Sequence, residues 1–439
     1  MLDLTNGDVD KVLFKFTMPM FISVIFQQLY NVADSLIAGK FAGEEALAAV
    51  GASYPITMIL MAVALGTGIG TMVIISNLYG SRDYKRMKTA VSTVMITTVI
   101  LSIVLSVLGL KSSSFMLDKL NTPHNIFVDS QIYLNIYIYG FIFLFLYNIS
   151  TGIFTSIGDS RIPLYFLIGS SLGNIVLDYV FVAKFNMGVA GVAYATLIAQ
   201  SIACILSLIV LRKKLKMIIS PKHKLFSFNE LKNISIVAIP SILQQSFISI
   251  GNIFIQGRIN TFGSSTIAGF AAGNKLNTFA LTSFTTIGNG ISSFTAQNIG
   301  AEKEDRIEKG FKAGLKISIT IGLALFLVFF FLGGNLVGLF LKEKNMDTIA
   351  IGHKFLKIIS PFYVVIALKL TADGVLRGSK NMNKFMIATF VDLILRVVLA
   401  FILSARLGST GIWLSWPVGW VIGSVLSFIY YRQIIKEYK

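Results

Sequence analysis

The sequence predicts an all-α integral membrane protein whose twelve transmembrane helices form two six-helix lobes. Of its 439 residues, 54% are hydrophobic and 13% are charged, and the mean hydropathy is +0.75. A soluble domain carries about 25% charged residues. The uncharged runs exceed the ~20 residues that cross the hydrocarbon of a bilayer, and they show no period-2 alternation. The third observation behind this fold class is an internal repeat.

The repeat relates residues 1–220, the expected N-terminal lobe, to residues 221–439, the expected C-terminal lobe. A shift of 220 positions brings Arg86 onto Arg306, and one extra residue near the start brings Pro19 onto Pro240. Six helices per half give both halves the same orientation, so we expect a pseudo-twofold axis along the membrane normal and a cavity between the lobes. Such a duplication in so apolar a chain is typical of a two-lobed transporter. The shift also superposes Gly43, Gly68, Gly70, Gly80, Gly158, Gly188 and Gly191 on Gly263, Gly288, Gly290, Gly300, Gly378, Gly408 and Gly411.

The apolar runs place the twelve helices in order. Most are uncharged runs, and four are shorter or carry a charge or two but are long enough with their flanks. In the first half we expect helices over Phe16–Ala33, Ala46–Ser81, Thr89–Leu110, Ser130–Gly158, Ile162–Leu177 and Phe185–Leu211. In the second half we expect them over Asn233–Gly257, Leu276–Ala301, Ile317–Leu341, Ile358–Ala372, Phe385–Ala405 and Leu407–Tyr431.

The net charge of +17 is interpreted as a topology signal. Basic residues crowd into alternate loops, and by the positive-inside rule those loops are cytoplasmic. Both termini and the linker Lys213–Lys232 are therefore expected on the cytoplasmic side of a plasma (inner) membrane. Met1–Asp10 has neither a basic start nor a cleavage site, so it is not read as a signal peptide. No basic stripe interleaves with aromatic residues, which argues against a nucleic-acid partner.

A polar stripe marks the first helix. Gln27, Tyr30, Asn31 and Asp34 are spaced i, i+3, i+4, i+7 on an otherwise apolar helix. Polar groups within a bilayer face the bundle interior or a watery cavity. Other polar residues of the first half that can converge with this stripe are Asn148 and Thr151 on the fourth helix, Asn174 and Asp178 one turn apart on the fifth, and Thr196 on the sixth.

These residues form a candidate cation-coupling site. Two carboxylates near each other in a low dielectric cannot both stay ionised cheaply, so Asp34 and Asp178 are candidate proton carriers. The same carboxylates could instead bind sodium together with Asn174, with Asn148 and Thr196 as further oxygen donors and Tyr30 beside them. A third interpretation is a polar network that only holds helices together. The residues leave these alternatives open.

The second half departs from the first at this site. Ile255 takes the place of Asp34, Val398 takes the place of Asp178, and a milder stripe of Gln245, Ser249, Asn252 and Gln256 remains. Coupling chemistry is therefore expected in the N-terminal lobe. The second half has its own charges: Lys369 with Asp373, and Asp392 with Arg396, are spaced i, i+4 and can neutralise each other. Lys275 and Arg396 have two interpretations. They are interfacial anchors and internal ion pairs, or they line the cavity and attract anionic groups of a substrate. The candidate residues of the substrate cavity are Gln27, Asn31, Gln245, Asn252, Lys275 and Arg396.

Several motifs together resemble one family. They are Gln27-Gln28-Leu29-Tyr30-Asn31-Val32-Ala33-Asp34, Gly66-Thr67-Gly68-Ile69-Gly70, Gly158-Asp159-Ser160-Arg161, Gln297-Asn298-Ile299-Gly300-Ala301 and Leu376-Arg377-Gly378. In this order they resemble the multidrug and toxic compound extrusion (MATE) family over the whole chain, and Asp34 resembles the branch related to DNA-damage-inducible protein F. The resemblance implies a V-shaped pair of six-helix lobes that exports compounds, driven by inward flow of protons or sodium.

The expected function is therefore a secondary active antiporter that moves small amphipathic organic compounds out of the cytoplasm. The alternative is a lipid-linked precursor flippase of the same superfamily, although flippases often carry fourteen helices and a strongly basic cavity. An enzyme is not expected, because no Walker motif, nucleophile triad or metal-binding His spacing is present. The glycines of Gly66–Gly70 are expected to permit close helix packing or bending. We expect a monomer without a bound cofactor that transports H⁺ or Na⁺.

Overall fold

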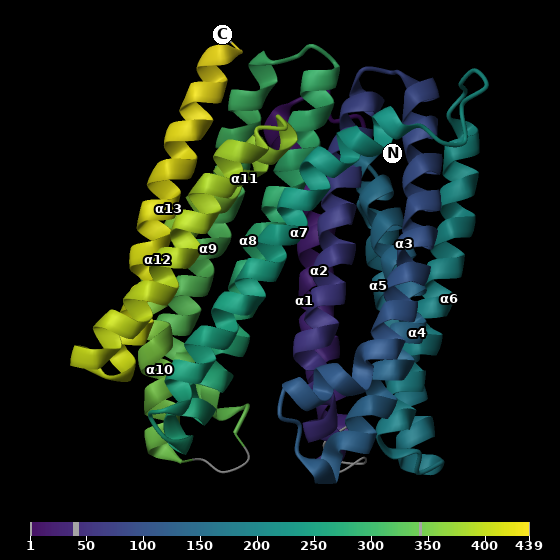
Figure 1. Cartoon of the computed structure of the whole chain (residues 1–439). Helices are drawn as coiled ribbons and strands as arrows, with labels where there is room; N and C mark the ends of the chain where they lie inside the picture. Colours follow the sequence, from purple (N-terminus) through teal and green to yellow (C-terminus); the bar gives the residue numbers. More distant parts are fainter. Residues whose placement is uncertain (1, 38–43, 342–344, 439) are drawn as a thin grey trace. The chain divides into compact units, whose positions relative to one another are not determined.

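The computed structural model describes residues 2–37, 44–341 and 345–438, and it is almost entirely helical. This confirms the predicted fold class. The helices, drawn in Figure 1, are α1 (Val9–Ile37), α2 (Glu44–Gly80), α3 (Tyr84–Lys119), α4 (His124–Ser156), α5 (Arg161–Asp178), η2 (Tyr179–Lys184), α6 (Gly188–Met217), α7 (Phe228–Asn260), α8 (Ser264–Gly300), α9 (Asp305–Gly338), α10 (Met346–Ile359), η3 (Ser360–Phe362), α11 (Tyr363–Gly378), α12 (Met382–Leu407) and α13 (Ser409–Glu437).

The internal repeat is visible in the helix boundaries. α2 and α8 are both 37 residues long, and each boundary of α8 lies 220 positions after that of α2. In the same way α4 corresponds to α10–η3–α11, α5 to α12, and α6 to α13. The fourth segment of the second half is interrupted at Ser360–Phe362, where Pro361 cannot donate a helical hydrogen bond. Within the described part of the chain, ten segments are long and apolar enough to span a membrane.

The chain folds into two compact units whose boundaries fall inside α1 and α7. The first unit contains Met1–Leu2 and Ile22–Ser246, and the second contains Asp3–Phe21 and Phe247–Lys439. The first part of α1 therefore packs with the second half of the sequence, and the first part of α7 packs with the first half. By the predicted topology, these first parts are the cytoplasmic ends of the two helices. α1 and α7 are each shared between the units along their length.

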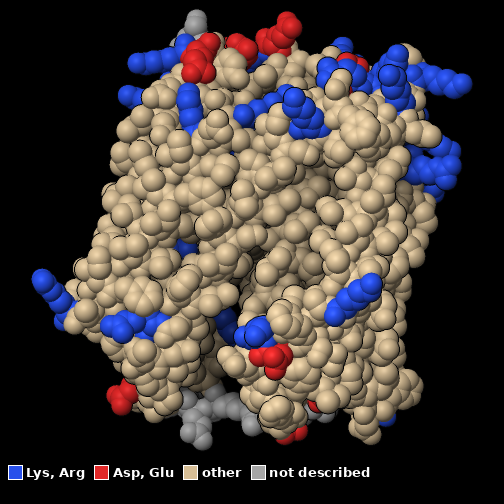
Figure 2. Space-filling view, viewed as in Figure 1, with Lys and Arg blue, Asp and Glu red and all other residues tan. Residues whose placement is uncertain are grey.

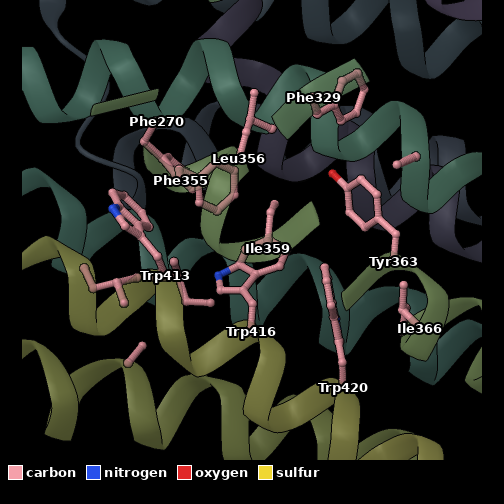
Figure 3. Packing of buried hydrophobic residues seen from close by; sticks show 14 of the residues in the cluster. Phe270, Phe329, Phe355, Leu356, Ile359, Tyr363, Ile366, Trp413, Trp416 and Trp420 are labelled. Atoms are coloured by element: carbon pink, nitrogen blue, oxygen red, sulfur yellow. The ribbon is translucent and has the colours of Figure 1, made fainter. Parts of the chain in front are cut away.

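The core of the second unit is strongly aromatic. Figure 3 shows Phe270, Phe355 and Trp413 packed beside one another, with Tyr363 and Trp420 further along the same cluster. The rings of Phe270 and Trp413 lie 5.1 Å apart and are nearly parallel. Aromatic pairs of this kind add about 0.5–1.5 kcal/mol beyond the area that they bury. The cluster packs α8, α10, α11 and α13 against one another.

Charged side chains gather at the ends of the helices. On the face shown in Figure 2, Lys and Arg are crowded near one set of helix ends, and the flanks between the ends are almost uncharged. Apolar flanks bounded by charged ends are what a bilayer requires of a multi-pass protein.

Candidate functional site

The polar residues of α5 are buried in the first unit. Asn174 and Asp178 lie one turn apart and are 2% and 1% exposed. Neither the Oδ1 nor the Nδ2 atom of Asn174 has a hydrogen-bond partner in the protein. Leaving a buried polar group unpaired costs about 1–3 kcal/mol, so such a group is unusual unless it serves a ligand, water or ion. The amide oxygen of Asn174 is therefore a candidate cation ligand that no hydrogen bond within the protein occupies.

A π-helical segment follows Asp178 directly. η2 begins at Tyr179, and the Phe185 N–H donates to the Val180 carbonyl, five residues back, over 3.0 Å. π-Helical turns are rare and frequently occur at functional sites. The local sequence Tyr-Val-Phe-Val-Ala-Lys is simply apolar, so the sequence contained no signal for this feature. The widened turn begins at the carboxylate that was predicted to take part in coupling.

Thr196 and Asn148 occupy neighbouring helices of the same unit. Thr196 donates to the Val192 carbonyl over 3.1 Å and lines a small cavity between α4 and α6 with Tyr133, Tyr137 and Gln200. Asn148 donates its amide N–H to the Leu144 carbonyl over 2.9 Å. Each side chain is the donor in its hydrogen bond, so these bonds do not use the lone pairs of Thr196 Oγ1 and Asn148 Oδ1.

The position of Asn148 is set by a close approach of α2 and α4. A Cβ placed on Gly152 would lie 2.7 Å from the Gly68 carbonyl oxygen, so the two helix backbones touch here. Gly68 in turn lies against the Asn148 backbone. The predicted packing role of the Gly66–Gly70 run is confirmed, because Gly66 and Gly70 also lie directly against α7.

The polar stripe of α1 is helical throughout. Tyr30 is half-buried, while Gln27 and Asn31 are exposed, and all three belong to the first unit. The backbone of Asp34 continues the helix, but its side chain lies outside the described residues. The structure therefore places Tyr30, Asn148, Asn174, Asp178 and Thr196 in one unit without describing the Asp34 carboxylate.

The other candidate cavity residues are divided between the units. Gln245 belongs to the first unit, and Asn252, Lys275 and Arg396 belong to the second. Lys275 is exposed, with its Nζ 5.4 Å from the centre of the Phe340 ring. Arg396 is buried and stacks on Trp416, with its guanidinium carbon 4.6 Å from the ring centre. The Nε and Nη2 atoms of Arg396 have no hydrogen-bond partner in the protein.

The second unit contains a buried charge cluster. Lys369 Nζ lies 2.8 Å from Asp373 Oδ2, which confirms the i, i+4 pair predicted along α11. Lys369 Nζ also lies 3.8 Å from Asp392 Oδ2. Asp392 is therefore close to a cation on the neighbouring helix and is also attracted by Arg396, its predicted i, i+4 neighbour on α12. Spacing reveals pairs within a helix but not those between helices.

The repeated helices and the buried polar groups on α5 are the features of a membrane transporter. The MatE family model matches residues 19–180 and, a second time, residues 240–402, so the chain belongs to the MatE family. Each match covers one copy of the internal repeat.

Named relatives and solved structures agree with this assignment. The probable multidrug resistance protein YpnP of Bacillus subtilis is 30% identical over 98% of this chain and 96% of its own length. The multidrug export protein MepA of Staphylococcus aureus is 23% identical over 93% and 90%. A crystal structure of a MATE transporter in complex with MaD3S is 25% identical and superposes with a TM-score of 0.91 over 100% of this chain and 98% of that one.

Proposed function

We propose that this protein is a secondary active exporter of amphipathic organic compounds, driven by the inward flow of protons or sodium. The observation that carries the proposal is the buried pair on α5, where the Asp178 carboxylate lies one turn from an Asn174 amide that no protein group satisfies. Ionisable residues inside membrane segments are rare and mark ion pathways. The relatives that are named as multidrug resistance and export proteins support the substrate class.

In this proposal, Asp178 and Asp34 exchange the coupling cation. A proton would bind to a carboxylate, whereas sodium would require the neutral oxygens of Asn174, Asn148 and Thr196 as further ligands. Tyr30 would position Asp34 from the preceding turn of α1. The site lies in the N-terminal lobe, since Ile255 and Val398 replace both carboxylates in the other repeat.

The substrate is proposed to contact polar groups on α1, α7, α8 and α12. An amphipathic cation or zwitterion presents an apolar body and a few hydrogen-bonding groups, which suits scattered amides better than a dense charged pocket. The residues proposed for this role are Gln27, Asn31, Gln245, Asn252, Lys275 and Arg396. We further propose a monomer in the plasma (inner) membrane, with both termini cytoplasmic and residues 1–220 and 221–439 as its functional halves.

The decisive experiment is transport in everted membrane vesicles with an imposed pH or sodium gradient. Wild-type vesicles should accumulate a lipophilic fluorescent cation when the gradient is applied, and Asp178→Asn should lose this accumulation because Asn cannot exchange a proton and carries no charge for sodium. Asp118→Asn, at the exposed end of α3, is the matched control and should transport normally. Full activity of Asp178→Asn would refute the coupling site. Gradient-independent movement of fluorescent lipids would favour the flippase alternative.

A further inference from the structure

The cluster in the second unit seats an ammonium group between two carboxylates. Lys369 Nζ lies 2.8 Å from Asp373 Oδ2 and 3.8 Å from Asp392 Oδ2. All three side chains are nine-tenths or more buried. Ser427 completes the shell by donating its hydroxyl to Asp373 Oδ1 over 2.6 Å. This is the arrangement that would hold a bound monovalent cation, except that the cation is attached to the chain.

The backbone of α13 fixes the cluster in place. A Cβ placed on Gly423 would lie 2.8 Å from Lys369 Cε and 2.8 Å from Asp392 Cβ. Helix α13 therefore packs directly on the lysine stem and leaves no space for it to swing away. The Oδ1 atom of Asp392 is buried and has no hydrogen-bond partner in the protein, so this carboxylate keeps an oxygen for a further ligand.

The internal repeat relates this cluster to the buried residues of the first unit. Lys369 and Asp373 lie on α11, which corresponds to the second part of α4, and Asp392 lies on α12, which corresponds to α5. A shift of 220 positions takes Asp392 to position 172, two residues before Asn174 and six before Asp178. The two groups thus lie on equivalent helices, with Asp392 about 9 Å along the helix axis from the equivalent of Asp178.

We propose that Lys369 is a built-in cation that permanently fills the second unit's counterpart of the coupling site. The two carboxylates retain a cation-binding geometry, but the ammonium cannot be exchanged because it is covalently attached and enclosed by α13. Cation exchange is thereby confined to the first unit. The comparison between units rests on the proposed function, whereas the cation-binding capacity of Asp373 and Asp392 does not.

Removal of the ammonium tests the proposal. Lys369→Met keeps the length and apolar stem of the side chain but removes the ammonium group from between the two carboxylates, so that Arg396 beside Asp392 is the remaining cation. The purified variant should then bind sodium. Its thermal unfolding midpoint should be about 5 °C higher in sodium chloride than in choline chloride at equal ionic strength. This rise is expected when the sodium concentration is about 100 times the dissociation constant of the site. Lys369→Met/Asp392→Asn, which removes one carboxylate as well, should lose this rise. Arg258→Met, at a cation bonded to Ser404, is the matched control and should show no gain.

All variants are made in an Asp178→Asn background, so that sodium bound at the proposed coupling site does not contribute. A sodium response of Asp178→Asn alone would count against that coupling site and leave the Lys369 comparison intact. If Lys369→Met does not fold, Lys369→Gln provides the same test, because its neutral amide can still donate to Asp373. A sodium response equal to that of the Asp178→Asn parent in the folded Lys369 variant would overturn the proposal.

Discussion

Gly70 on α2 lies directly against Ala238 on α7: a Cβ placed on Gly70 would be 2.7 Å from both the Cβ and the backbone nitrogen of Ala238. The repeat reproduces this contact in the other unit, where Gly290 on α8 lies against Thr17 on α1. The two contacts explain why α1 and α7 are each shared between units. Helix α2 binds the first half of α7, and α8 binds the first half of α1.

Gly70→Ala should destabilise the first unit. The added methyl group cannot fit without moving the α7 backbone, and overpacking of this kind costs about 1–3 kcal/mol. Gly51→Ala on the same helix is the matched control, since a Cβ there meets nothing within 4 Å. The control should be neutral or slightly stabilising, because alanine favours a helix over glycine by about 1 kcal/mol. Thermal unfolding in detergent measures both variants, and equal midpoints for the two would contradict the contact.

The sequence allowed the helices and the repeat to be predicted because both are local or periodic signals. It did not reveal the shared helices, since Ala238 follows Gly70 by more than a hundred residues and neither residue carries a pattern that names its partner. The sequence did not predict the pairing of Lys369 with Asp392 for the same reason. In the candidate site, the residue types on α5 indicated polarity, but the π-helical turn after Asp178 depends on packing that no local pattern encodes. The roles of Asp34 and Asp178, and the branch within the family, stay predictions.

Leu4 anchors the N-terminal segment to the second unit. Its side chain is fully buried, its N–H donates to Gln297 Oε1 over 3.3 Å, and its carbonyl accepts from Asn298 Nδ2 over 3.2 Å. Leu4→Ala should therefore lower the free energy of unfolding by about 2–4 kcal/mol. Leu225→Ala, at a side chain that is 72% exposed, should change it by less than about 0.5 kcal/mol. A Leu4→Ala midpoint as high as that of Leu225→Ala would show that this segment does not dock in solution.

Asp3 gives the same segment a weak dependence on pH. Burial alone would raise the pKa of Asp3, but hydrogen bonds from Thr5 and Asn6 and the charge of Lys303 together lower it below its ordinary value of 3.8. The ionised carboxylate therefore stabilises the fold above that pH, and its contribution is lost as the pH falls below it. The side chain is exposed, so the contribution should stay under about 1 kcal/mol.

Unfolding midpoints of Asp3→Asn and wild type test this effect. The variant should be less stable at neutral pH, and the difference should shrink as the pH falls below 3.8. A difference that grows toward low pH would mean that the sign of the pKa shift is wrong.

Cysteine labelling tests the proposed topology. A cysteine that replaces Lys222, in the basic linker, should react only with reagent supplied from the cytoplasmic side, and one that replaces Glu44 should react only from the outside. The single native cysteine, Cys204, is 1% exposed, so it should contribute little background. The unsubstituted protein serves as the control. Labelling of both positions from the outside would refute the arrangement of twelve crossings.

The curvature of α1 should depend on the bound cation. Residues of α1 up to Phe21 belong to the second unit and those from Ile22 to the first, so α1, like α7, is a helix in which a rearrangement of either unit can be absorbed. A cation drives such a change only if it binds the two states differently. The polar segment Gln27–Asp34 is the expected bending point, because its side chains can replace backbone hydrogen bonds that open when the helix bends.

Structures of this protein at low and high pH, each with and without sodium, should differ in the path of α1 after Ile22. Asp178→Asn should remove the difference by abolishing cation binding, while Asp118→Asn should keep it. An unchanged α1 in all four conditions would refute this coupling mechanism and would leave membership of the family untouched.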